Sequence, residues 1–202
     1  MDIVQLELLP PDLPLDRVAD FYPNFLNPTQ ADELFTASLA LDWQQNQITM
    51  FGKAINNPRL ESIYGDPGCD YVYSGILLEA RPWAEPLLKL RDRLEAEFGY
   101  RFHIAIGNLY RDGNDSIGWH ADTEETLAER PPIASISLGV TRRFSLRPND
   151  KSTFPTHFDL THGSLLLMLP GCQQTHKHQL PKRPNLTERR INWTFRPHIR
   201  GH

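Results

Sequence analysis

Two residues near the middle of the chain have types and spacing suited to binding a metal ion. His120 and Asp122 are two residues apart, and in an extended segment such side chains lie on one face. With one more histidine from another strand, they would complete a 2-His-1-carboxylate triad. Such a triad leaves coordination positions open and suits non-haem Fe(II) that must also bind O2 and a co-substrate. The pair therefore predicts a metal site of this kind.

The third ligand must come from the histidines downstream. His176 and His178 could both face the same side of a strand, so spacing alone does not choose between them. The chain has 8 histidines, so a His-x-Asp pair is a weak signal by itself, and a lone histidine is more often an ordinary surface or core residue. Surface or turn positions are expected for His157, His162 and His198.

A second polar cluster, at residues 190–196, could hold a co-substrate that carries two carboxylates. Polar and apolar residues alternate here, which on a strand places them on opposite faces. The polar face combines two arginines with hydrogen-bonding side chains, and guanidinium groups bind carboxylates in a bidentate manner. A strand with one solvated face would show the same alternation and is the alternative. The polar residues are Arg190, Asn192, Thr194 and Arg196, and the apolar ones are Ile191, Trp193 and Phe195.

The overall composition is typical of a globular protein with one substantial core. The chain has 202 residues, of which 40% are hydrophobic and 23% charged. No apolar run approaches the roughly 20 residues that a membrane span needs, and the N-terminus lacks the features of a secretory signal. Cys69 and Cys172 are too few for a disulfide framework. We therefore expect a monomer in the reducing cytoplasm, or in the nucleus if the source is eukaryotic.

The formal net charge of −4 is unevenly distributed, because acidic residues predominate in residues 1–100 and basic residues in residues 101–202. A weakly basic half could border a groove for a polyanion such as a nucleic acid. A solvated surface of mixed charge would explain the same counts.

The segments before residue 100 predict two helices among turns and short strands. Apolar spacing indicates one helix from Pro28 to about Ala40, with Thr29 as its cap, and a second from Pro82 to Phe98. Residues 1–27 are rich in proline and aspartate, which indicates an irregular arm. Short strands are expected at residues 48–53 and 71–74, with turns at residues 56–58 and 64–68.

After Gly99 the pattern changes to short strands separated by turn-forming residues, which favours a sandwich or barrel. The predicted fold class is α+β, mainly β, with a double-stranded β-helix (jelly roll) supported by N-terminal helices. No linker divides the chain, so we expect a single domain over residues 1–202 with its jelly-roll core at residues 100–198. The expected strands are 102–110, 133–140, 144–147, 157–160, 164–169 and 190–196.

Several motifs become specific when they are taken together. They are Asn108-Leu109-Tyr110-Arg111-Asp112-Gly113, His120-x-Asp122, residues 132–139, His178-Gln179-Leu180-Pro181 and Arg190-x-Asn192-x-Thr194-x-Arg196. In combination they resemble the AlkB family of Fe(II)- and 2-oxoglutarate-dependent dioxygenases, which repair alkylated bases. The resemblance covers residues 43–198. It selects His178 over His176 as the third ligand, because an apolar residue and a proline follow His178 at the family's spacing.

The resemblance implies a role for each matching position around the cofactors, which are Fe(II) and 2-oxoglutarate with O2 as co-substrate. Fe(II) would be held by His120, Asp122 and His178. The distal carboxylate of 2-oxoglutarate would pair with Arg190, helped by Tyr110 and Asn192. The end that chelates iron would lie near Arg196, Asn108 and Thr194. The implied catalytic set is His120, Asp122, His178 and Arg196.

The resemblance also implies a nucleotide-recognition region at residues 43–80. There, Met50-Phe51-Gly52-Lys53 looks like a finger hairpin that fills the gap left by a flipped base, and its apolar tip favours duplex DNA. Tyr71-Val72-Tyr73-Ser74-Gly75 resembles the base pocket, where Tyr73 would stack on the base and Tyr71 would contact its polar edge. Phe51, Tyr71 and Tyr73 could instead be core residues.

Charged residues complete the implied substrate site. Glu124 would lie near the exocyclic amino group of the base, and Thr123 stands where the family's DNA-repair members often have aspartate. Phosphate contacts are expected from basic residues, each of which could also be a plain surface charge. These residues are Lys53, Arg59, Arg142, Arg143, Lys182 and Arg183.

The activity implied by the resemblance is oxidative demethylation of 1-methyladenine and 3-methylcytosine in single- or double-stranded DNA, with release of succinate, CO2 and formaldehyde. One alternative is an RNA demethylase. Another is a 2-oxoglutarate-dependent hydroxylase of a protein or small molecule. A non-catalytic jelly-roll binding module is the third, since one fold can host many functions, but the combined triad and arginine pair argue against it.

Overall fold

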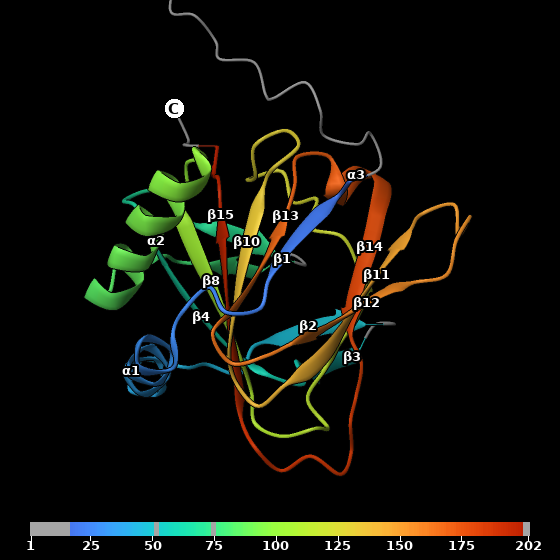
Figure 1. The fold of residues 1–202 in the computed structure, drawn as a ribbon, viewed down its shortest axis with the longest axis horizontal. Coiled ribbons are helices and arrows are strands. Elements are labelled where there is room, and N and C mark those ends of the chain that lie inside the picture. Colours follow the sequence, from blue (N-terminus) through green and yellow to red (C-terminus); the bar gives the residue numbers. More distant parts are fainter. Residues whose placement is uncertain (1–16, 51–52, 74–75, 200–202) are drawn as a thin grey trace, which may run out of the picture.

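The computed structural model describes residues 17–50, 53–73 and 76–199, and its strands form two large sheets and two separate hairpins (Figure 1). Along the larger sheet the order is β1 (Ala19–Tyr22), β13 (Ser164–Met168), β10 (Ile133–Gly139), β15 (Arg190–Arg196), β8 (Ile104–Tyr110), β4 (Leu60–Gly65) and β7 (Arg81–Pro82). The smaller sheet contains β12 (Thr156–Leu160), β11 (Arg142–Pro148), β14 (His176–Leu180) and β9 (Ile117–His120). The hairpins pair β2 (Gln47–Met50) with β3 (Lys53–Asn56), and β5 (Tyr71–Tyr73) with β6 (Ile76–Leu78).

The larger sheet packs on different partners through its two faces. One face packs against helices α1 (Pro28–Leu39) and α2 (Glu85–Phe98), which lie beside it in Figure 1. The other face meets the smaller sheet, where Ile133 and Leu166 pack with Phe144 and Leu146. Two antiparallel sheets with helices on one side confirm the predicted mainly β, jelly-roll class. None of the helices among the described residues is long and apolar enough to cross a membrane.

Both long helices are confirmed, but the cap of the first and the start of the second differ from the expected positions. The α1 cap is Asn27, whose side chain accepts a hydrogen bond from the Gln30 backbone in a reciprocal capping box, so the expectation of Thr29 is wrong by two residues. The second helix begins at Glu85, because Arg81 and Pro82 form β7 and pair with β4. Gly99 ends it with a backbone φ of 72°, a left-handed conformation that suits glycine.

Several strands, among them β1, β4 and β9, occupy segments that were expected to be irregular or had no assigned strand. Residues 19–22 belong to the presumed N-terminal arm, but they form β1, which pairs with β13 as the edge strand of the larger sheet. The unpredicted β4 lies between β8 and β7 and is buried along most of its length, so its Glu61 and Ser62 break the apolar pattern of a buried strand. The third, β9, ends at His120 and therefore carries the metal motif on its end.

The strand β15 confirms the alternation of residues 190–196 and excludes a solvated face. All seven of its residues are buried. Ile191, Trp193 and Phe195 pack toward the helices, whereas the four polar residues line a pocket between the two sheets. The alternation therefore separates a helix-packed core from a polar cavity wall.

Candidate active site

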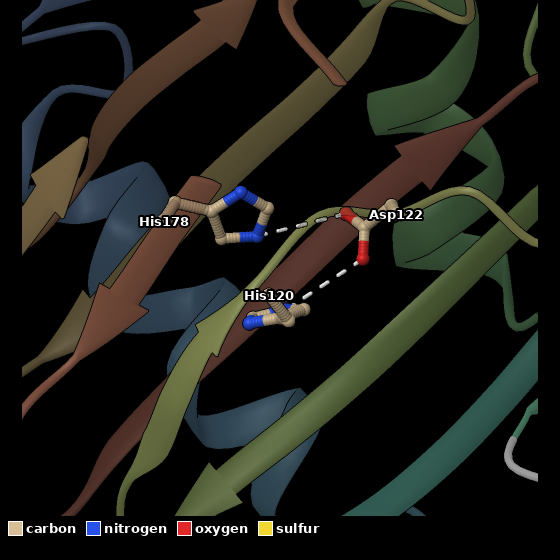
Figure 2. Close-up of side chains that lie close together, drawn as sticks. All are labelled: His120, Asp122 and His178. Atoms are coloured by element: carbon tan, nitrogen blue, oxygen red, sulfur yellow. Dashed lines mark ion pairs between the residues drawn. The ribbon is translucent and has the colours of Figure 1, made fainter. Parts of the chain in front are cut away.

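The smaller sheet brings the three expected metal ligands together. His120 ends β9 and lies directly opposite His178 of β14, because these two residues are paired across the antiparallel strands. Asp122 follows β9 by two residues. Its Oδ1 is 3.7 Å from His120 Nε2 and its Oδ2 is 3.8 Å from His178 Nε2 (Figure 2). One donor atom from each residue lies within 4.8 Å of the others, a spacing that a single metal ion can bridge.

The structure resolves the choice between the two histidines of β14. His178 is 4% exposed and stacks on Phe144, with ring centroids 5.2 Å apart. His176 lies at the start of the strand, where its Nδ1 is 2.8 Å from Thr175 Oγ1 and remote from the cluster. Among the other candidates, His157 is exposed as expected, whereas His198 is buried with its Nε2 bonded to Asp70 O, so the expectation of a surface position for His198 is wrong.

The surroundings of the three ligands suit metal binding. His120 Nδ1 lies 2.8 Å from the carbonyl oxygen of Gly118, which can only accept, so Nδ1 donates to it and the ring presents Nε2 toward Asp122. Burial lowers the pKa of His178 to about 3, although the charge of Asp122 opposes the shift. Burial raises the pKa of Asp122, but the charges of Arg196 and the two histidines outweigh it, so this pKa lies below its usual value. At neutral pH His178 is therefore a neutral imidazole and Asp122 is a carboxylate, the states that metal binding needs.

A divalent metal should therefore stabilise the folded protein without any substrate. At about 100 times its Kd, a ligand that binds only the folded state adds about 2.7 kcal/mol, which in a domain of this size corresponds to roughly 5–10 °C in Tm. We expect this shift with Fe(II) under anaerobic conditions, measured by differential scanning fluorimetry. Asp122→Ala should abolish the shift, whereas Asp150→Ala, which removes an exposed carboxylate, should preserve it.

Arg190 forms the opposite end of the pocket and suits a carboxylate. It is 2% exposed, and its Nη2 donates to Ser137 Oγ at 2.8 Å and to Asn192 Oδ1 at 2.7 Å. Its guanidinium lies 5.2 Å from the ring centre of Tyr110. Within the described residues, Arg190 has no ion pair and its buried Nε has no hydrogen-bond partner. Burial lowers the pKa of Arg190 to about 10, so the site has a cation that an anionic ligand would neutralise.

Arg196 lies at the metal end of the same strand face. Its Nη2 is 3.2 Å from Asp122 Oδ2, and its Nη1 donates to Tyr71 Oη at 2.6 Å. Its Nε donates to Thr194 Oγ1 at 3.3 Å. Glu124 lies beside this group, with Oε2 4.0 Å from Arg196 Nη1. The β15 side chains therefore extend from the Arg190 end of the pocket to the metal ligands, and Asn108 on the neighbouring β8 lines the same pocket.

Sequence reasoning missed part of the wall of this pocket. Ser135 and Ser137 donate to Asn192 Oδ1 at 3.0 and 3.4 Å, so the amide nitrogen of Asn192 is the end left to donate to a ligand. The polar alternation of these serines within β10 was a signal for this face. Glu61 of β4 also lines the pocket, and no sequence signal indicated it because β4 itself was not predicted.

Two expected phosphate contacts are contradicted by burial. Arg59 is 4% exposed and lies in the pocket wall, where its Nη2 contacts Glu61 Oε1 at 2.6 Å. Arg142 is 1% exposed and donates to the backbone carbonyls of Asp112, Asp115 and Pro181. Neither guanidinium can reach a backbone phosphate on the surface. Arg143 is exposed but bonds to Asp159, whereas Lys53, Lys182 and Arg183 are exposed.

The expected base-contacting residues are only partly described. Tyr71 is 3% exposed and lines the pocket beside Glu124, with its hydroxyl on Arg196. Tyr71 therefore lines the pocket, as the resemblance implied, and is also buried, as the alternative of a core residue implied. Phe51, Gly52 and Ser74 lie outside the described residues, as does the side chain of Tyr73.

Comparisons with known proteins agree with this geometry. The sequence profile of the 2OG-Fe(II) oxygenase superfamily matches residues 19–196, and the chain belongs to that superfamily. It is a member of the AlkB family within it: the chain is 38% identical over 174 residues to the DNA oxidative demethylase ALKBH2 of Mus musculus, covering 83% of this chain and 70% of that protein. It is 36% identical over 186 residues to the alpha-ketoglutarate-dependent dioxygenase alkB homolog 3 of Homo sapiens, covering 87% of this chain and 64% of that protein.

Other relatives extend the same comparison. ALKBH2 of Homo sapiens is 37% identical over 171 residues, which cover 81% of this chain and 63% of the relative. The chain thus spans between 63% and 70% of the length of these three relatives. The superfamily uses Fe(II) and 2-oxoglutarate, and the residues present fit both. The triad gives two imidazoles and a carboxylate whose donor atoms converge, and Arg190 gives a buried cation with an unbonded Nε.

Proposed function

We propose that this protein oxidatively demethylates alkylated bases in DNA, with 1-methyladenine and 3-methylcytosine as its substrates. The observation that carries the proposal is one pocket that joins the metal triad, the arginine-bearing face of β15 and a Tyr71–Glu124 pair. Both methylated bases are cationic, and a partly buried carboxylate beside an aromatic ring suits a flat cation. The curated relatives named as DNA oxidative demethylases support the same substrate class.

The side chains around the co-substrate bind and orient it. Fe(II), O2 and 2-oxoglutarate together supply the oxidation of the N-methyl group, with one oxygen atom entering succinate, CO2 leaving, and the oxidised methyl group leaving as formaldehyde. Arg190 binds the distal carboxylate, with Tyr110 and Asn192 beside it. Arg196, near Asp122, lies at the end that reaches the metal, with Asn108 and Thr194 nearby. Buried donors at both ends fix a diacid in one orientation and keep water from the reacting carbon.

The substrate side consists of elements outside the two large sheets. A base in a duplex must leave the stack before its methyl group can reach a buried metal. Tyr71 and Glu124 contact the extruded base, Tyr73 stacks on it, and Ser74 belongs to the same segment. The finger hairpin with Phe51, Gly52 and Lys53 occupies the gap left in the duplex, and Arg59 supports the pocket wall from within.

One assay tests the proposal directly. The purified protein is given Fe(II), ascorbate and 2-oxoglutarate with DNA and RNA oligonucleotides, single- and double-stranded, that carry 1-methyladenine or 3-methylcytosine. We expect formaldehyde and repaired base in equal amounts from DNA. Faster repair of RNA would replace the DNA assignment. Succinate formation that no oligonucleotide stimulates would indicate a hydroxylase of another substrate.

Phe51→Ala is expected to lower kcat/KM for duplex DNA by roughly tenfold or more, and for single strands much less. The reason is that unstacking a base step costs on the order of a few kcal/mol, which an apolar side chain in the gap offsets. Initial rates on matched duplex and single-stranded oligonucleotides measure the ratio. Phe154→Ala, which removes a 94% exposed aromatic side chain from the β11–β12 loop, is the control. Equal losses on both substrates would reject the finger assignment.

We further infer that the protein acts as a monomer in the cytoplasm, or in the nucleus of a eukaryote. Cys69 and Cys172 are both buried free thiols, which suits a reducing compartment. Size-exclusion chromatography with light scattering tests the oligomeric state, and a dimer as the main species would contradict it.

A further inference from the structure

The hairpin β2–β3 has little support of its own. It forms a two-stranded sheet that is separate from both large sheets (Figure 1). All four residues of β3 are exposed, so this strand does not pack into a core. Isolated two-stranded hairpins are at best marginally stable in water. The direction in which this hairpin points must therefore depend on how its base is held.

Two asparagines close the base of the hairpin. Asn46 precedes β2 and Asn57 follows β3, and the Asn57 backbone N–H donates to Asn46 O at 2.8 Å. Their side chains converge on one acceptor: Asn46 Nδ2 lies 2.9 Å and Asn57 Nδ2 lies 3.0 Å from the same oxygen, Glu61 Oε2. Glu61 is on β4, a strand of the larger sheet. Just before the hairpin, the backbone of Gln44 pairs with that of Glu61, and the hairpin base itself is attached to the larger sheet through the buried Glu61 carboxylate.

The other carboxylate oxygen of Glu61 connects this attachment to the active-site pocket. Glu61 Oε1 accepts a hydrogen bond from Arg59 Nη2 at 2.6 Å. Arg59 Nε in turn donates to Asn108 Oδ1 at 2.7 Å. Arg59, Glu61 and Asn108 all line the pocket that contains the metal triad. A continuous series of hydrogen bonds therefore runs from the hairpin base to the pocket wall.

The chemistry of the cluster explains why position 61 carries a carboxylate. Three donors point at this side chain, and an ionised carboxylate is an acceptor at both oxygens. A glutamine would replace one acceptor oxygen with an NH2 group, which cannot accept a hydrogen bond. At least one of the three donors would then lose its hydrogen bond. Glu61 and Arg59 are 6% and 4% exposed, so removal of the carboxylate would also leave a buried cation without this partner.

We propose that Glu61 is a positioning residue that fixes the orientation of the hairpin at residues 47–56 relative to the active-site pocket. The proposal rests on the proposed function, in which this hairpin engages duplex DNA while the base enters the pocket. Holding the hairpin in advance reduces the ordering cost of binding a duplex. A single-stranded substrate does not need the hairpin, so its binding depends less on Glu61.

The first test needs no activity. Hydrogen–deuterium exchange of residues 47–56 is compared in the wild type, Glu61→Ala, Glu61→Gln and the double variant Asn46→Ala/Asn57→Ala. The double variant removes both donors and keeps the Arg59–Glu61 pair, so it tests the anchor even if Glu61→Ala fails to fold. We expect exchange to rise by roughly tenfold in Glu61→Ala and the double variant, and by less in Glu61→Gln. Glu79→Ala, which removes an exposed carboxylate from the neighbouring groove, should match the wild type.

The second test measures the consequence for substrate. In the double variant, KM for methylated duplex DNA should rise by roughly tenfold, whereas KM for single-stranded DNA and for 2-oxoglutarate should change by less than about threefold. Unchanged hairpin exchange in the double variant would overturn the anchor. Faster exchange with equal KM changes on both DNA forms would overturn its role in duplex binding. A wild type that repairs no oligonucleotide, with exchange still responding, would reject the proposed function and leave the anchor supported.

Discussion

The His120→Ala variant is expected to form succinate from 2-oxoglutarate at less than about one-hundredth of the wild-type rate. Loss of a hydrogen-bond partner behind a metal ligand already costs about 10–100-fold, and loss of the ligand itself costs more. The two remaining ligands, Asp122 and His178, cannot hold the metal in a facial arrangement. The His120 side chain is 24% exposed, so its removal should change Tm by less than about 5 °C. Coupled succinate detection and a thermal melt measure the two quantities.

His157→Ala is the matched control for this prediction. His157 lies on β12 of the same sheet and is exposed, with its Nδ1 2.9 Å from Ser145 Oγ. It should keep wild-type turnover and metal-dependent stabilisation. Normal succinate formation by the His120→Ala variant would show that the metal binds elsewhere.

Arg190→Met is expected to have opposite effects on co-substrate binding and on stability. Removing one partner of a buried guanidinium–carboxylate pair typically costs 2–5 kcal/mol, so KM for 2-oxoglutarate should rise by roughly 30-fold to 4000-fold. In the free protein, however, Arg190 is a buried cation with no ion pair to a described residue. Methionine has a similar length and needs no solvation, so Tm without ligand should stay the same or rise.

The contrast between the two measurements distinguishes a binding residue from a structural one. A structural arginine would lower Tm when replaced, and KM would rise only through partial unfolding. Arg143→Met is the control, since Arg143 is exposed on the smaller sheet and bonds to Asp159. An Arg190→Met variant with unchanged KM for 2-oxoglutarate would reject the role of Arg190.

The catalytic face of the fold could be predicted from the sequence because it follows the two-residue repeat of a strand. That repeat placed His120 beside Asp122, and it placed Arg190 and Arg196 on one face of β15. The choice of His178 came from the family resemblance. His176 and His178 are two residues apart, so on a strand their side chains point to the same side and spacing does not separate them. Only the burial of His178 opposite His120 shows the physical reason.

The elements that hold the substrate side could not be predicted in the same way. A strand such as β4 contains buried Glu61 and Ser62, whose polarity hides it from any pattern based on apolar residues. Arg59 and Arg142 resemble surface cations in sequence, yet both are buried by partners distant along the chain: Arg59 bonds to Asn108, and Arg142 to Pro181 O. Which charges are internal depends on long-range contacts that the sequence does not display.

The separation of β2–β3 from both large sheets has a consequence for how this enzyme could diversify. The metal ligands and the β15 arginines belong to sheets whose strands depend on one another, whereas this hairpin is connected to its neighbours through its base. Its length and tip can therefore change by insertion or substitution without altering the register of any catalytic strand. An engineer could exchange residues 47–56 for another loop, keep Asn46, Asn57 and Glu61, and expect the oxidation chemistry to survive a change of substrate.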